Sequence, residues 1–265
     1  WGNDSVTPGA GSITAAMISS GLQLGTIDAQ NNTLLGSTAG DSFSGTDATA
    51  NTLIGYAAGT AITTGDLNTA VGKNALYLNT TGNYNVGIGA NSLSNNTASE
   101  NTAIGYNSAK EITTGTRNTV VGYAALDACT TGVDNVAVGQ AALSNATTAS
   151  YNTALGRSAL IANTTGISNV AIGYVALTAN STASYNTAIG SAALDANTTA
   201  EGNTGIGYAA LSANTTGADN TAIGKNSLLS NTTASNNVAV GSEALDANTT
   251  GVQNVALGKG SLSLN

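Results

Sequence analysis

Side chains that could take part in catalysis are few and far apart in this sequence. There is no histidine, so the commonest general base and metal ligand is missing. Asp127, Asp195 and Asp246 share one position of a repeat described below, but whole coils separate them, so they cannot act as a carboxylate pair within one chain. The single cysteine, Cys129, has no histidine to activate it. We therefore expect no enzyme, no bound metal and no cofactor.

The composition excludes several further classes of protein. Of the 265 residues only 8% are charged and 4% aromatic, whereas a globular domain carries about 25% charged residues. The 41% of hydrophobic residues argues against disorder. The net charge is −8 with six basic residues, so no nucleic-acid partner is expected. No apolar run approaches the roughly 20 residues of a membrane span, so we expect no membrane insertion of this segment. Because the chain begins at Trp1 and not at Met, we expect a processed product or a fragment.

A repeat organises nearly the whole chain. The pentad Asn-[Thr/Val]-x-[Ile/Val/Leu]-Gly occurs 14 times, and from Asn101 to Asn254 every interval is 17 residues. We number the positions of each repeat from 0, at the leading Asn, to 16. The prediction is a repeat domain over residues 32–265 and an N-terminal cap or connector over 1–31, in which 13–20 could form a short helix or strand that caps the rod.

The pattern within one unit predicts short strands and tight turns. Positions 1 and 3 are β-branched or aliphatic, position 2 is usually Ala and position 4 is always Gly, which is typical of a strand followed by a turn. Ala-Leu at positions 7 and 8 predicts a second short strand, and Asn-Thr-Thr-Gly predicts the turn that follows. Two such strands in 17 residues predict one coil of an all-β parallel β-solenoid. Stacking 14 coils at about 4.8 Å would give a rod of roughly 65 Å.

Identical positions would stack into ladders along the rod. We expect positions 1, 3 and 8 to fill a thin aliphatic core, while small Ala at position 2 lets another surface approach. Position 11 accepts Asn, Ile and Cys, which predicts an inward-facing corner where Asn side chains satisfy backbone groups. Cys129 is then a buried ladder residue and not a nucleophile. The predicted ladder residues are Ile172, Ile189 and Ile206 at position 3, Leu126, Leu194 and Leu245 at position 8, and Asn163, Asn197, Asn214 and Asn248 at position 11.

Tyrosines gather at the variable positions, which must lie outside. Five of the nine tyrosines stand at position 5 and three at position 16, just before the pentad. Those at position 16 are Tyr84, Tyr151 and Tyr185. Two interpretations stay open: a solvated column beside a glycine turn, or a stripe that contacts a glycan or a neighbouring subunit. The five tyrosines at position 5 are Tyr56, Tyr106, Tyr123, Tyr174 and Tyr208.

The pentads resemble a known repeat. Asn-Val-Ala-Ile-Gly at 169–173, Asn-Thr-Ala-Ile-Gly at 186–190 and Asn-Val-Ala-Val-Gly at 237–241 are similar to the head motif of YadA-type trimeric autotransporter adhesins. The longer pattern resembles the arrays of bacterial and phage tail-fibre-domain proteins. The resemblance implies a left-handed β-roll, a side-by-side homotrimer, and an extracellular place on a bacterial surface appendage or a virion that binds a host glycan or protein receptor. The 17-residue unit is longer than the usual adhesin head repeat, and these residues hold no coiled-coil stalk, anchoring barrel or self-cleaving chaperone domain.

The expected function is that of a non-enzymatic fibre segment. A coil of 17 residues encloses little apolar volume, so burying a further face between three chains would supply the missing area. Two alternatives remain. Adjacent threonines at positions 12 and 13 could bind ice, provided that they form a flat face, and the rods could join end to end as an architectural filament.

Overall fold

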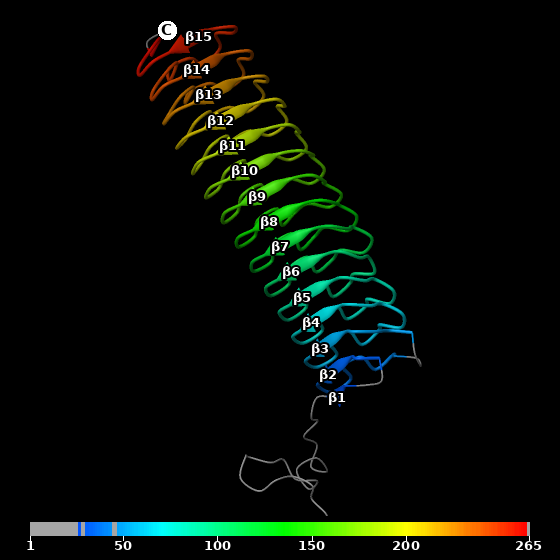
Figure 1. Cartoon of the computed structure of the whole chain (residues 1–265). Helices are drawn as coiled ribbons and strands as arrows, with labels where there is room; N and C mark the ends of the chain where they lie inside the picture. Colours follow the sequence, from blue (N-terminus) through cyan, green and yellow to red (C-terminus); the bar gives the residue numbers. More distant parts are fainter. Residues whose placement is uncertain (1–25, 28–29, 44–46, 264–265) are drawn as a thin grey trace, which may run out of the picture.

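The chain folds into a parallel β-solenoid of about 13 turns with roughly 17 residues per coil (Figure 1). The structure, a computed structural model, describes residues 26–27, 30–43 and 47–263, and it contains no helix among them. The segment 13–20, expected to form a capping helix or strand, lies outside the described residues. The predicted all-β solenoid is confirmed.

Each coil contributes one three-residue strand at positions 1 to 3. Consecutive strands pair in parallel and in register, so that Ile172 lies beside Ile189 and Ile189 beside Ile206. At the start of the rod the short β1 (Thr26–Ile27) runs antiparallel to β2 and occupies its outer edge. The other strands are β2 (Thr33–Leu35), β3 (Thr52–Ile54), β4 (Thr69–Val71), β5 (Val86–Ile88), β6 (Thr102–Ile104), β7 (Thr119–Val121), β8 (Val136–Val138), β9 (Thr153–Leu155), β10 (Val170–Ile172), β11 (Thr187–Ile189), β12 (Thr204–Ile206), β13 (Thr221–Ile223), β14 (Val238–Val240) and β15 (Val255–Leu257).

The strands face the opposite way from the prediction. Their middle residues point inward, and Ala171 and Ala188 are fully buried, while positions 1 and 3 point outward. The expectation that Ile172, Ile189 and Ile206 fill the core is therefore wrong; they form a ladder on the outer face. The alternation itself was correct, but a strand of three residues fits either phase. Leucines from the opposite wall fill the core and leave room for a small side chain in most coils. The larger exceptions are Val120 and Leu53, and Leu53 lies against Gly59, which stands where other coils have the leucine.

The second predicted strand, at positions 7 and 8, does not form. Positions 6 and 8 adopt positive φ, as in Ala192 (55°) and Leu194 (52°), which is left-handed backbone and not strand. Their N–H groups consequently point to opposite neighbours: Ala192 donates to the Tyr174 carbonyl of the preceding coil, and Leu194 to the Ala210 carbonyl of the next (3.0 Å each). This turn-like segment nevertheless delivers the core leucines, because Leu126, Leu194 and Leu245 are fully buried as expected.

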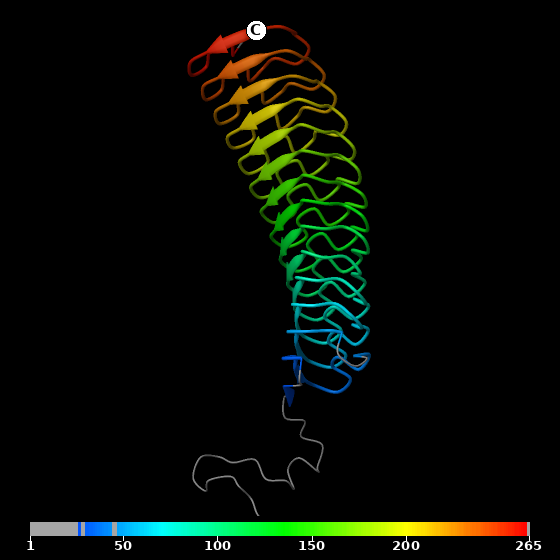
Figure 2. The same ribbon diagram turned by 45° about the vertical axis from the view of Figure 1, so that its right-hand side comes forward.

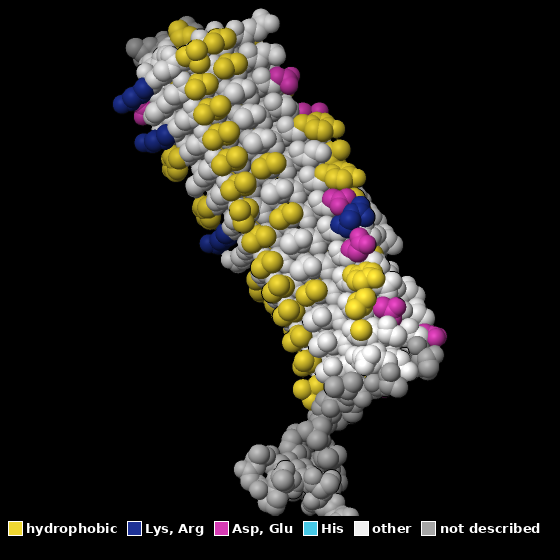
Figure 3. Space-filling view, in the orientation of Figure 1, with side chains coloured by type: hydrophobic (Ala, Val, Ile, Leu, Met, Phe, Trp, Pro, Cys, Tyr) yellow, Lys and Arg dark blue, Asp and Glu magenta, His cyan; other side chains and the backbone are white. Residues whose placement is uncertain are grey.

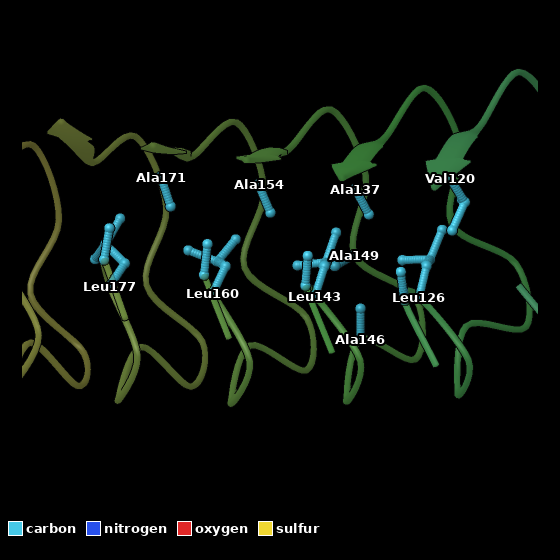
Figure 4. Close-up of a cluster of buried hydrophobic side chains, with 14 of the residues drawn as sticks. Val120, Leu126, Ala137, Leu143, Ala146, Ala149, Ala154, Leu160, Ala171 and Leu177 are labelled. Carbon is cyan, nitrogen blue, oxygen red and sulfur yellow. The ribbon is translucent and has the colours of Figure 1, made fainter. Parts of the chain in front are cut away.

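The core is one leucine and one small residue thick. In Figure 4 the strand residues Ala137, Ala154 and Ala171 point toward a column of leucines from the other wall, Leu143, Leu160 and Leu177. All of these side chains are fully buried. Each coil therefore buries a similar small apolar volume, and stability accumulates by stacking coils and not by a large central core.

Two columns of buried asparagines hold the corners of the coils. At position 11 the side-chain amides of Asn180, Asn197, Asn214, Asn231 and Asn248 each donate to the Oδ1 of the asparagine one coil before, at 2.9–3.2 Å, and to the backbone carbonyl three residues onward. The expectation that Asn163, Asn197, Asn214 and Asn248 face inward is thus confirmed.

The leading asparagine at position 0 forms the second column, and we did not predict this column from the sequence. In a typical coil the Oδ1 of Asn186 accepts the backbone N–H of Asn203 (2.9 Å), and its amide donates to the carbonyl of Ala200 (2.8 Å). One side chain therefore joins two coils and closes its own turn. The signal was present in the sequence as an Asn that never varies between repeats.

Candidate interaction surface

Side chains that ligate metals do not gather in the part of the chain that the structure describes. In the described ranges no three His, Cys, Asp or Glu residues are grouped so that they could hold a metal ion. Asp127, Asp195 and Asp246 lie on separate coils, as the repeat numbering predicts. Nor is any helix of the described residues long and apolar enough to cross a membrane.

Cys129 lies fully buried in the position-11 column of the core. Burial raises the pKa of its thiol to about 11, since a thiolate would lose its hydration there. At neutral pH the side chain is therefore a protonated apolar group, in agreement with its predicted role as a ladder residue.

Asp195 and Asp246, both at position 9, each hold one carboxylate oxygen that is buried and accepts no hydrogen bond. Burial raises the pKa of Asp195, and likewise that of Asp127, because it disfavours the charged form. Desolvation is the largest cause for both carboxyls; Glu111 adds a smaller upward contribution to the pKa of Asp127, and no other acid contributes at Asp195.

The outer face of the strands is a continuous apolar stripe. Position 3 carries Ile, Val or Leu and position 1 carries Thr or Val in all 14 repeats, without a charged residue. Ile104, Leu155 and Ile223 are 38–43% exposed, which is high for aliphatic residues at the centre of a sheet. Figure 3 shows this stripe as a column of hydrophobic side chains along the whole rod. We call positions 1 and 3 of β2 to β15 the strand face.

Exposed tyrosines line both margins of the strand face. Tyr56, Tyr106, Tyr123, Tyr174 and Tyr208, at position 5, are 46–59% exposed, and the three tyrosines at position 16 are at least 57% exposed. The rings of Tyr106 and Tyr123 stack at 5.4 Å between centroids, and the Arg157 guanidinium lies 5.9 Å from the centre of the Tyr174 ring. The column is thus partly ordered by neighbours one coil away, and its faces remain open to a partner.

An open hollow of about 530 Å³ lies beside the position-5 column near the start of the rod. Two exposed rings, Tyr56 and Tyr77, line it together with the side chains of Asp41 and Lys73. Tyr77 is the only aromatic residue at position 9, so this combination occurs once along the rod. The hollow is open to solvent and combines aromatic faces with one acidic and one basic side chain.

The threonine pairs at positions 12 and 13 do not form a free hydroxyl face. Hydroxyls at position 12 donate to the backbone carbonyl of the same position in the next coil, as Thr130 does to Thr147 (3.1 Å) and Thr198 to Thr215 (3.1 Å). They are structural, while the position-13 residues point to solvent at a turn.

Comparisons of the chain with protein-family models, with curated proteins and with solved structures give no match.

Proposed function

We propose that the chain is a non-enzymatic rod segment of an extracellular or virion appendage, in which three copies pack side by side and present a surface for attachment. The proposal includes a left-handed winding of the coils, as in the adhesin heads whose motif the pentads resemble. The observation that carries it is the strand face: an uncharged aliphatic column along every strand of the rod. Exposed apolar patches of this continuity mark interaction sites in soluble proteins.

Association through this face would bury the additional apolar surface that the thin core does not provide. Each partly exposed Ile, Val or Leu that a partner covers contributes about 25 cal/mol per Å² of apolar surface removed from water. The gain repeats at each coil because the rod is periodic. The sequence pattern predicted that another surface approaches closely at the small residues of position 2; those residues are buried, so we assign the contact to positions 1 and 3.

The first test is the mass of the protein in solution. Light scattering after size exclusion should give three times the 25.8 kDa of one chain. Ile189→Glu should shift the mass toward the monomer, because it would bury a carboxylate in the interface. Ile161→Glu, an isoleucine at position 9 away from the strand face, is the matched control and should leave the mass unchanged. A wild-type monomer at all concentrations would refute the side-by-side assembly.

Attachment is assigned to the hollow at Tyr56 and Tyr77. Tyrosine rings offer apolar faces with a polar edge, which suits a sugar ring. On a glycan array the wild type should bind a definite set of glycans, and Tyr56→Ser with Tyr77→Ser should lose them. Tyr185→Ser, at a tyrosine about as exposed as Tyr56 but outside the hollow, should keep them. Equal loss in both variants would remove the hollow from the proposal.

Ice binding and end-to-end filaments are the two other functions that the repeats allow. Ice binding needs a flat face, and the strands turn gradually about the rod axis (Figure 2). Thermal hysteresis by a stable monomer would favour it. For filaments, β1 already pairs with the outer edge of β2, so a coil of another copy cannot pair with β2 directly at that end. Micrographs of long unbranched filaments would favour that function.

A further inference from the structure

The hollow at Tyr56 and Tyr77 is built from the same repeat positions of three consecutive coils. Position 5 supplies Tyr56 and, one coil later, Lys73. Position 9 supplies one residue from each coil: Asp41, Thr60 and Tyr77. Position 6, between them in the chain, supplies Thr38, Ala57 and Asn74.

The two charged groups of the hollow are accessible and lie at different heights along the rod. Asp41 is exposed, whereas the acids at position 9 of later coils, Asp127, Asp195 and Asp246, are half-buried. Asp41 belongs to the first coil and Lys73 to the third, so they stand two coil steps apart, roughly 10 Å along the rod. A ligand that runs along the hollow would therefore meet one charge after the other.

Neither charge is neutralised within the chain. The two ion pairs of the described residues involve neither Asp41 nor Lys73, although both side chains line the same hollow. An unpaired carboxylate and an unpaired ammonium are thus both left to a ligand, at opposite ends of one site.

The remaining polar groups of the hollow are mainly acceptors. The side-chain amide of Asn74 donates to Asn91 (3.1 Å), and that of Asn91 donates to Asn107 (3.0 Å). The Asn74 Oδ1 is the acceptor end of this row, in which hydrogen bonds polarise one another. The Thr60 hydroxyl donates to the Thr38 carbonyl (2.7 Å), which leaves its oxygen free to accept. Such acceptors suit the hydroxyl groups of a sugar.

We propose that the glycan held by this hollow is zwitterionic: a disaccharide segment with an amino group at Asp41 and a carboxylate at Lys73, its rings lying against Tyr56 and Tyr77. This inference rests on the glycan attachment proposed above and adds the charge and the length of the ligand. Two linked sugar residues cover the distance between the first and third coils.

A ligand with a single kind of charge would fit less well. An anionic glycan would face Asp41 and a chain with a net charge of −8, and a cationic glycan would face Lys73. Like charges in apposition penalise both. A peptide with one Lys and one Asp offers the same two charges, but the tyrosine faces and the row of acceptors favour sugar rings with their hydroxyls.

Calorimetric titration of the full chain with matched disaccharides tests the charge requirement. The first probe is glucuronic acid linked to glucosamine with a free amine. Its N-acetylated form lacks the cation, and glucose linked to glucosamine lacks the carboxylate. Each loss should weaken binding by roughly fivefold at low salt, about the worth of one exposed ion pair. Salt at about 0.5 M should reduce both differences.

Substitutions assign each preference to its residue. Asp41→Asn should lose the preference for the free amine and keep that for the carboxylate, and Lys73→Gln should do the reverse. Asp219→Asn and Lys225→Gln change exposed charges outside the hollow and should keep both preferences.

The outcomes separate this inference from the glycan attachment itself. Equal affinities for the three disaccharides, or preferences that survive Asp41→Asn and Lys73→Gln, would overturn the zwitterionic ligand. Glycan attachment would still stand if the array binding were lost in the Tyr56→Ser, Tyr77→Ser variant. An array without any bound glycan, or tighter binding of a Lys–Asp peptide that this variant abolishes, would overturn both proposals.

Discussion

At the scale of single residues, the molecule depends on polar groups buried inside an aliphatic rod. Asn197 donates to the Oδ1 of Asn180 and to the carbonyl of Ala200, and it accepts from Asn214. Its Ala substitution would leave the Oδ1 of Asn180 without this donor and one N–H of Asn214 without an acceptor, while the Ala200 carbonyl keeps its hydrogen bond from Asn186. We expect Asn197→Ala to lower the free energy of unfolding by about 1–3 kcal/mol per orphaned group in urea titrations.

The control for this prediction is Thr199→Ala, which changes an exposed side chain on the adjoining turn. It should change the free energy of unfolding by less than about 0.5 kcal/mol. Equal effects of the two substitutions would show that the asparagine column does not contribute specifically to stability.

Asp195 should make the stability of the rod depend on pH. Burial raises the pKa of its carboxyl in the folded state, so the charged form opposes folding above that pKa, and the penalty disappears below the unfolded value of about 3.9. Asp195→Ser, which introduces the residue that Ser212 supplies one coil later, should therefore stabilise the protein at pH 7 and have no effect near pH 3.

The contribution of Asp134 to stability should change with pH in the opposite direction, so Asp134 serves as the control. The hydrogen bond from Arg117 lowers the pKa of Asp134, so its contribution to stability is present above the unfolded pKa and is lost as the pH falls through the folded one. Asp134→Ser should destabilise slightly at pH 7. Urea titrations of both variants at pH 7 and pH 3 compare the two, and a stabilising effect of Asp195→Ser that persisted at pH 3 would contradict the desolvation explanation.

At the scale of the coil, the glycine after each strand sets the turn. Gly207 has φ of 135°, and a Cβ there would stand 2.5 Å from the Gly224 carbonyl oxygen of the next coil. Gly207→Ala should therefore cost more than the roughly 1–3 kcal/mol of a strained φ alone. Gly258→Ala is the matched control, because φ is 109° and no atom lies within 4 Å of its Cβ position. Equal losses in thermal melts would assign the cost to φ and not to coil contact.

Within one coil, some features could be predicted from the sequence and others could not. The 17-residue period, the strand at positions 1 to 3 and the buried asparagines at position 11 were all predictable. The burial of position 2 was not, because alternation over three residues cannot tell the core face from the outer face. Nor was the left-handed backbone at Leu194, since leucine rarely adopts positive φ without contacts to neighbouring coils that impose it.

At the scale of the whole molecule, the rod should behave as a one-dimensional stack. Deleting residues 186–202 removes one complete coil and joins Tyr185 to Asn203, which restores the normal junction. Because each coil contacts only its neighbours, this variant should keep the far-UV spectrum per residue and lose only a small part of its stability. Deleting 186–193 instead should unfold the adjacent coils, since it destroys the register of every ladder. Similar melting of the two deletions would contradict the stacking model.

The sequence by itself determined the solenoid, because a 17-residue period held over many repeats can satisfy its backbone only by stacking identical coils. It also determined the identity of the ladders, since in-register stacking places equal positions together. Only the tertiary structure decided which side of each strand faces out. The Leu column of the opposite wall fills the narrow core and leaves space for Ala or Gly in most coils, so the Ile, Val, Leu and Thr side chains of positions 1 and 3 lie at the surface. That outcome creates the apolar strand face.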